Sequence, residues 1–188
     1  MTTYAPSDLS DVWMQTYTGK RFYILQPERL EVDLYDIAHH LSNESRFGGA
    51  TYDFYSVAQH SVAVSLICRS EHAALGLLHD ATEAYLKDIP NPLKQVLRPI
   101  YGDLESRLAK RIGDHFGLDL VALPLDVHEA DRIMLATEKR DLLNPVQEGG
   151  PAWDPRGLLQ PLPGTIEPLE PHVAKYAFIQ RALRLGLL

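Results

Sequence analysis

Apolar residues recur along most of this chain with the spacing of an α-helix. Side chains three and four residues apart share one helix face, so this spacing marks a buried stripe. It predicts helices over 33–45, 55–68, 71–86, about 100–116, about 126–143 and about 172–186. A polar and aromatic stretch around Gly19, within 12–30, predicts a short β-hairpin instead. The expected fold is mostly α, a helical bundle with a small N-terminal β-hairpin.

Several local signals mark the ends of these helices. Asp33, Ser70 and Asp126 stand where an N-cap side chain would accept a backbone N–H of the first turn. The sequence DIPNP at 88–92 predicts a loop, because its two prolines remove donors and restrict the residues before them. Residues 144–171, rich in proline and glycine, predict a long irregular connection.

The length of 188 residues suits one domain with a full core, and the chain shows no Gly/Ser linker, charge block or internal repeat. We therefore expect a single domain over 1–188. Its parts are a β appendage at 1–32, the helical core at 33–143, and an irregular loop with a last helix at 144–188.

Polar residues occupy positions on these stripes where core residues belong. His60 lies on the stripe that Val57 and Val64 define, so its side chain is expected to face inward. His79 falls on the apolar side of the next predicted helix, and Asp80 is its neighbour round the axis. Two imidazoles and a carboxylate are thus directed toward the interior of the bundle.

Asp131 repeats this pattern farther along the chain, on the apolar side that Val127 and Met134 form. Alone, an inward aspartate is also explained by an ion pair with an arginine, and His60 alone by a hydrogen-bonded core histidine. Together, two histidines and two aspartates need a common partner, because an unpaired buried carboxylate costs several kcal/mol. A divalent cation satisfies all four.

The ligand types narrow the chemistry of such a site. Two imidazoles and two carboxylates suit one ion of Mn, Fe, Co, Ni or Zn better than Ca or Mg. Four protein ligands leave octahedral positions for a water and a substrate oxygen. The ion would acidify the water to a hydroxide nucleophile near neutral pH and polarise a phosphoryl oxygen.

The series His60, His79-Asp80 and Asp131 resembles the H…HD…D signature of the HD-domain metal-dependent phosphohydrolases. The likeness covers roughly residues 33–142. It implies an HD-domain helical bundle in which these four residues bind one divalent metal. It also implies a nucleotide substrate and a homodimer.

Two stretches make the resemblance closer, SVAQHS at 56–61 and HDATEAYLKDIPNPLK at 79–94. They are similar to the bacterial 5'-deoxynucleotidase branch and to related small HD hydrolases of bacteria and phages. The likeness implies that Glu83, working with Asp80, orients or deprotonates the attacking water, and that Asp88 binds the sugar 3'-hydroxyl. The alternative for Glu83 is pairing with a lysine or with water.

Three further residues are expected to bind substrate. Arg46-Phe47 resembles the family's Arg-Trp pair, which meets the phosphate and the base, and Lys94 would approach the phosphate. The alternatives are a solvated Arg46, a core Phe47 and an exposed Lys94. Phe47 departs from the expected Trp, and the connection between His60 and His79 is shorter than in the best-known deoxynucleotidases, which puts the choice of substrate in doubt.

Charge and missing motifs argue against several other classes of protein. The net charge of -7 disfavours binding to nucleic acid polymers or anionic membranes, while a single nucleotide stays compatible. The chain has no HExxH, GxSxG or phosphate-cradling glycine loop and no apolar run that could cross a bilayer. The N-terminus has no secretory pattern, so a cytoplasmic location is expected. Cys68, the single cysteine, is predicted to be inert packing.

These observations predict a metal-dependent phosphohydrolase that converts a 5'-deoxynucleoside monophosphate to the nucleoside and phosphate. A deoxynucleoside triphosphate hydrolase would use the same metal site and is the alternative within the class. A nucleotide-sensing HD domain without turnover is the alternative outside it.

Overall fold

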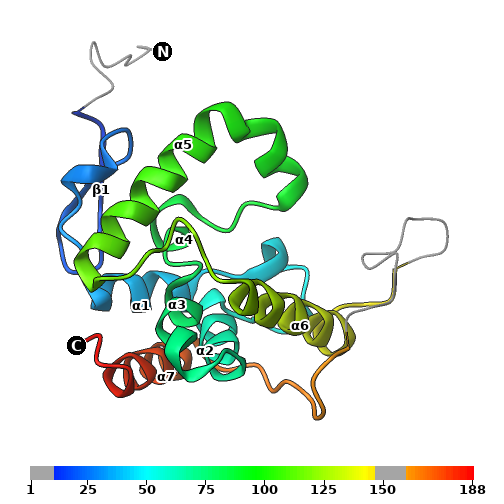
Figure 1. The fold of residues 1–188 in the computed structure, drawn as a ribbon. Coiled ribbons are helices and arrows are strands. Elements are labelled where there is room, and N and C mark those ends of the chain that lie inside the picture. Colours follow the sequence, from blue (N-terminus) through cyan, green and yellow to red (C-terminus); the bar gives the residue numbers. More distant parts are fainter. Residues whose placement is uncertain (1–10, 147–159) are drawn as a thin grey trace.

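The computed structural model describes residues 11–146 and 160–188 as a mostly helical protein with a hairpin at one side (Figure 1). Strands β1 (Trp13–Gln15) and β2 (Arg21–Tyr23) pair antiparallel, with Met14 opposite Phe22. The predicted class, a helical bundle with a small N-terminal β-hairpin, is confirmed.

The α-helices lie close to the predicted segments, with differences at several ends. They are α1 (Leu34–Asn43), α2 (Val57–Ile67), α3 (Ala73–Leu78), α4 (Glu83–Leu86), α5 (Asn91–Phe116), α6 (Leu125–Leu142) and α7 (Pro171–Arg184). Residues 160–170 form neither helix nor strand, as predicted for the irregular connection. Residues 147–159 of that connection lie outside the described part of the chain.

One of the three predicted caps is confirmed. The Asp33 side chain accepts the N–H of Tyr35 at 2.8 Å and caps α1. The prediction for Ser70 is wrong, since this residue begins a short 3₁₀ turn and caps neither that turn nor α3. Asp126 is also not a cap, because α6 begins one residue before it. Its carboxylate bonds instead to His72 Nδ1 at 2.6 Å.

Helix α5 begins at Asn91, about nine residues before its predicted start. Pro92 is tolerated there because the first turn of a helix needs no N–H from that position. The helix also continues through Pro99. The predicted loop at 88–92 therefore ends at Pro90, and the break from α4 is made at Lys87, whose φ is 74°.

The helix predicted over 71–86 is interrupted in the structure. Helix α3 ends at Leu78, and a turn over the next four residues leads to α4. The N–H of Glu83 donates to the Asp80 carbonyl at 2.9 Å. This bond spans three residues, as in a 3₁₀ turn, and not the four of an α-helix. His79 Nδ1 bonds the Gly76 carbonyl at 2.9 Å, which an uninterrupted helix would give to a backbone N–H. The His79 side chain thus takes the carbonyl that a backbone N–H would need to continue the helix.

The helices share one large hydrophobic core and a smaller second one. Helix α7 lies against α1 and α2, and the main core joins these helices to the hairpin, α3, α4 and α5. Its large buried side chains include Phe22, Leu30, Ile37, Leu41, Leu77, Leu78, Leu108, Ile112 and Phe178. The smaller core holds Val64 of α2 with Ala130 and Met134 of α6.

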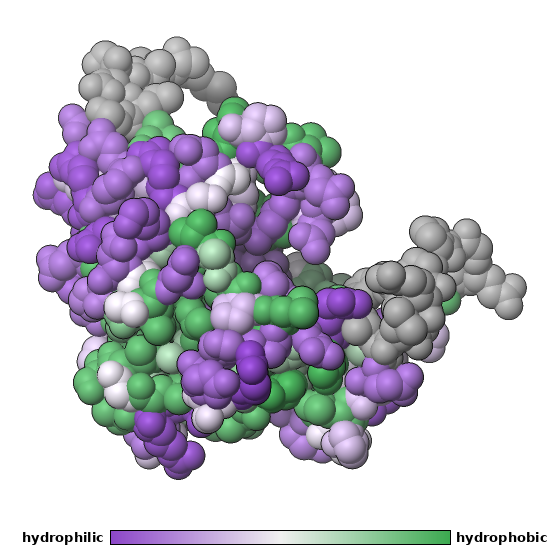
Figure 2. All heavy atoms as spheres, in the orientation of Figure 1, coloured by the Kyte–Doolittle hydropathy of each residue, from purple (hydrophilic) through white to green (hydrophobic). Residues whose placement is uncertain are grey.

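Polar side chains predominate over the hairpin, α5 carries both polar and exposed apolar side chains, and apolar ones gather over the helices below (Figure 2). The same view shows a hollow between the α5 arm and those helices. Among the described helices, none combines the length and the apolar content needed to cross a bilayer.

Cys68 follows α2 and packs against α3, where a Cβ added to Gly76 would lie 2.7 Å from its Sγ. Burial, followed by the nearby Asp126 carboxylate, raises the pKa of the Cys68 thiol to about 11. Because only the thiolate reacts, we expect alkylation at pH 8 to be about 100-fold slower than for a free cysteine. Labelling with iodoacetamide followed by mass spectrometry measures this rate.

The control for this labelling is the same protein in urea, where Cys68 reacts at the ordinary rate. Equal rates in the folded and unfolded protein would contradict the predicted inertness.

Candidate metal centre

Helix α2 carries His60 into the interior as its stripe predicts. Ser56 caps the helix by accepting the N–H of Gln59 at 3.2 Å, which sets the first turn. One turn later the His60 side chain is fully buried, on the side that also holds Val57 and Val64. The inward direction predicted for His60 is confirmed.

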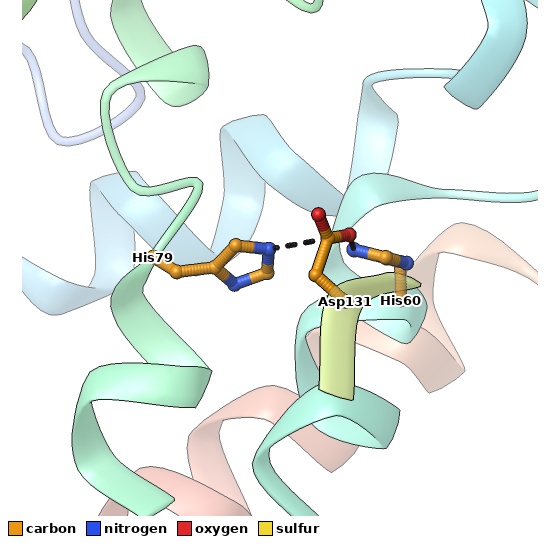
Figure 3. Close-up of side chains that lie close together, drawn as sticks. All are labelled: His60, His79 and Asp131. Carbon is orange, nitrogen blue, oxygen red and sulfur yellow. Dashed lines mark ion pairs between the residues drawn. The ribbon is translucent and has the colours of Figure 1, made fainter. Parts of the chain in front are cut away.

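Three side chains from separate elements meet around one point (Figure 3). One ligand atom of each of His60, His79 and Asp131 lies within 4.8 Å of the others. The Asp131 carboxylate from α6 stands between the two rings, with its Oδ1 3.2 Å from His60 Nε2 and 4.0 Å from His79 Nε2. This cluster could hold a metal ion.

Asp80, the fourth predicted ligand, lies beside this cluster but is not one of its three mutually close ligand groups. Its Oδ2 is 3.2 Å from His79 Nε2 and 3.7 Å from His60 Nε2. The turn between α3 and α4 directs both His79 and Asp80 toward the cluster, so neighbouring residues serve one site. Asp131 faces this site while 41% of its side chain stays exposed, which leaves one side of the cluster open to solvent.

The nitrogen atoms fit a metal ion. Nε2 of His60 and Nε2 of His79 are buried, and among the described residues neither makes a well-aligned hydrogen bond, although each lies 3.2 Å from a carboxylate oxygen. Buried polar atoms are otherwise nearly always bonded. In both rings the other nitrogen is held, His79 Nδ1 by the Gly76 carbonyl and His60 Nδ1 by Glu138 at 2.6 Å. Metal-binding histidines are oriented in this way in proteins.

The charges of the cluster reinforce one another. Burial alone would raise the pKa of Asp131, but the His60 and His79 imidazoles outweigh it and hold that pKa below its usual range. Burial alone would lower the pKa of His79, but the Asp80 carboxylate outweighs it and raises the pKa to about 9. A bound cation would take the place of these ring protons, so metal binding and protonation compete.

Glu83 lies beside the cluster, at the start of α4, and only 5% of it is exposed. Its Oε1 accepts from Lys94 Nζ at 3.2 Å, whereas its buried Oε2 has no hydrogen-bond partner among the described residues. Burial, followed by repulsion from Asp80 and Asp88, raises the pKa of Glu83 well above its usual value. One oxygen is therefore paired with a lysine, and the other is available to a water molecule.

Lys94 belongs to this group rather than to the exposed surface. Its Nζ also donates to Glu105 Oε1 at 3.0 Å, so it bridges α4 and α5. Asp88 is half-buried, and this burial is the main cause that raises its pKa. The Arg46 guanidinium opposes the shift and the Asp80 carboxylate adds to it. Lys94 and Asp88 thus lie in the electrostatic surroundings of the cluster.

Arg46 is buried, which rules out the alternative of a solvated loop residue. Its NH2 donates to Glu138 Oε2 at 3.0 Å, and its NH1 lies 3.6 Å from Asp80 Oδ2. The guanidinium carbon is 5.2 Å from the centre of the Phe47 ring. Phe47 has a φ of 56°, a left-handed backbone that is costly for a bulky side chain, next to Gly48 with a φ of 60°.

Glu138 is the site residue that the sequence reasoning missed. It lies on α6 two turns after Asp131, on the stripe that Met134 continues, and its side chain is fully buried. Burial would raise the pKa of Glu138, but His60 and Arg46 outweigh it and lower that pKa. The sequence did carry a signal for it. Glu138 follows Val127, Asp131 and Met134 at helical spacing, so it is a second acid on the same apolar stripe as Asp131.

Other histidines lie outside the cluster. His39 stacks on Tyr17 with ring centroids 3.7 Å apart, and His40 Nδ1 bonds the Ala84 carbonyl at 2.7 Å. These contacts agree with packing roles for the pair. His128, one turn before Asp131, is exposed on α6.

Comparison with known proteins gives two relatives. A scan against protein-family models found no match. The uncharacterized protein YfdR of Escherichia coli is 42% identical over 158 residues, which cover 81% of this chain and 88% of that protein. The uncharacterized protein RCAP_rcc00048 of Rhodobacter capsulatus is 34% identical over 127 residues, covering 63% of this chain and 64% of that protein. Because the 42% identity to YfdR extends over 88% of that protein, the chain belongs to the same family as YfdR.

Proposed function

We propose that this protein is a metal-dependent phosphohydrolase of the HD-domain class that removes phosphate from 5'-deoxynucleoside monophosphates. The observation that carries the proposal is the cluster of His60, His79 and Asp131, whose ligand atoms lie within 4.8 Å of one another, with Asp80 Oδ2 3.2 Å from His79 Nε2. The mixed nitrogen and oxygen donors favour one ion of the Mn, Fe, Co, Ni or Zn group. When bound, that ion would supply Lewis acidity toward a water and a phosphoryl oxygen.

Residues around the cluster divide the remaining tasks. Glu83 would accept a proton from the attacking water through its Oε2, which is buried and has no hydrogen-bond partner among the described residues. Arg46 contributes a positive charge beside Asp80 that would stabilise the phosphoryl oxygens. We assign Asp88 to the sugar hydroxyl, Phe47 to the base and Lys94 to holding Glu83 near the phosphate.

A substrate panel tests this proposal. Protein stripped of metal would be reloaded with Mn, Co or Mg and given deoxy- and ribonucleoside mono-, di- and triphosphates. We expect inorganic phosphate and a nucleoside from the 5'-deoxynucleoside monophosphates. Release of tripolyphosphate from triphosphates would establish the triphosphate hydrolase instead. Nucleotide binding without turnover under every metal would contradict an enzyme and favour a sensing domain.

Glu83→Gln tests the assignment of the base. The amide cannot take up a proton, so we expect kcat to fall by about 10²-fold. Metal affinity is expected to stay nearly unchanged, because Glu83 is not one of the four proposed ligands. Steady-state phosphate release and a metal titration on the same sample separate the two effects.

The matched control is Glu105→Gln, which removes the other carboxylate partner of Lys94 and leaves Glu83 in place. It is expected to keep nearly full activity. Equal losses in the two variants would mean that Glu83 acts only as a partner of the lysine.

A further inference from the structure

We propose that Glu138 is a positioning residue for the metal centre, which fixes the ring of His60 so that Nε2 faces the ion and joins that ring to Arg46. This inference deepens the proposed function and rests on the metal centre within it. It assigns a role to a carboxylate that the ligand signature does not include.

Both oxygens of Glu138 are engaged inside the protein. The side chain is fully buried on α6. Its Oε1 is 2.6 Å from His60 Nδ1, and its Oε2 accepts from Arg46 NH2 at 3.0 Å. A carboxylate held at both oxygens has little freedom to turn, so the position of the His60 ring is determined by α6 as well as by α2.

The contact also selects the form of the imidazole. A carboxylate only accepts hydrogen bonds, so the ring nitrogen beside it, Nδ1 of His60, must carry the proton. In the neutral ring the lone pair then lies on Nε2. That atom is the one 3.2 Å from Asp131 Oδ1 and 3.7 Å from Asp80 Oδ2. Glu138 thus presents the free electron pair of His60 to the cluster.

Arg46 completes the arrangement. Its guanidinium bonds Glu138 on one side and lies 3.6 Å from Asp80 Oδ2 on the other. The contacts therefore close a ring through His60, Glu138, Arg46 and Asp80, which includes two of the four proposed ligands. A displacement of Glu138 would shift a ligand imidazole and the arginine together.

Glu138→Gln preserves the shape of the side chain and removes its charge. An amide cannot accept from His60 and Arg46 with both of its heavy atoms, since one of them is a donor. We expect the affinity for Co²⁺ to fall by about 10- to 100-fold, as for the loss of a residue that orients a ligand. The visible absorption of bound Co²⁺ reports this affinity without any turnover.

Two controls separate positioning from stability. Asp36 is also a fully buried acid, but it bonds Thr18 in the hairpin at 2.6 and 2.9 Å. Asp36→Asn is expected to lower the melting temperature and leave the Co²⁺ affinity unchanged. Glu129→Gln, at an exposed position of α6, is expected to change neither.

The tautomer of His60 can also be measured directly in the wild-type protein. Two-bond proton–nitrogen spectra of the metal-free protein at alkaline pH identify which nitrogen of His60 is protonated, with assignment by a His60→Gln variant. We expect the proton on Nδ1, and this reading stands even where Glu138→Gln does not fold. A proton on Nε2, or equal Co²⁺ affinity in Glu138→Gln and wild type, would overturn the inference. Wild type that binds no Co²⁺ would refute the proposed metal centre, while the spectrum still decides the orientation of His60.

Discussion

His79→Ala is expected to lower kcat/KM for the nucleotide substrate by at least about 10³-fold, because a metal site supplies several kcal/mol of transition-state stabilisation. The variant removes one of the two nitrogen donors of the proposed site, whose Nε2 lies 3.2 Å from Asp80 Oδ2. Its metal content should fall in parallel with its activity. Phosphate release and elemental analysis of the purified variant measure both quantities.

The control for this experiment is His128→Ala. His128 is exposed on α6, one turn before Asp131, so its loss changes the histidine count near the site without touching the cluster. It is expected to retain its metal and its activity. Full activity in His79→Ala, with a normal circular dichroism spectrum, would refute the proposed mechanism.

Phe178→Ala is expected to destabilise the protein by about 3–5 kcal/mol, the usual cost of truncating a buried aromatic side chain. Phe178 is fully buried in the main core on α7, which lies against α1 and α2. For a chain of this length the loss corresponds to a fall in melting temperature of roughly 10 °C. Urea unfolding and thermal melts measure the two values.

Tyr176→Ala provides the comparison on the same helix. This tyrosine is 64% exposed, so its removal is expected to change the free energy of unfolding by less than about 0.5 kcal/mol. If both variants unfolded at the same urea concentration, α7 would not form part of the main core.

The sequence was most informative where one periodic stripe had one unusual member. His60 could be placed because its neighbours at three and four residues are apolar, and a buried helix face is set by that spacing alone. The Asp33 cap followed from an equally local rule. The four proposed ligands could be grouped because each carries a cost of burial that only a shared partner removes.

Other features depend on contacts between distant residues. Arg46 is buried because Glu138, 92 positions away, meets it with a carboxylate, and no local pattern announces that pair. The break after Leu78 depends on a histidine ring bonding a carbonyl within its own turn. The start of α5 depends on where a proline falls relative to the first turn, which is the least certain part of a helix to place from periodicity.

The division of the apolar interior into two clusters has a kinetic consequence. Helix α6 contacts α2 and α3 and belongs to the small cluster around Met134, yet it carries both Asp131 and Glu138. An ion at the centre would act as a cross-link between α6 and the turn that bears His79. Local opening of this one helix would withdraw a ligand and loosen a second at the same moment. Release of the ion would then be coupled to the detachment of α6, which itself has to break the bond between Asp131 and the metal.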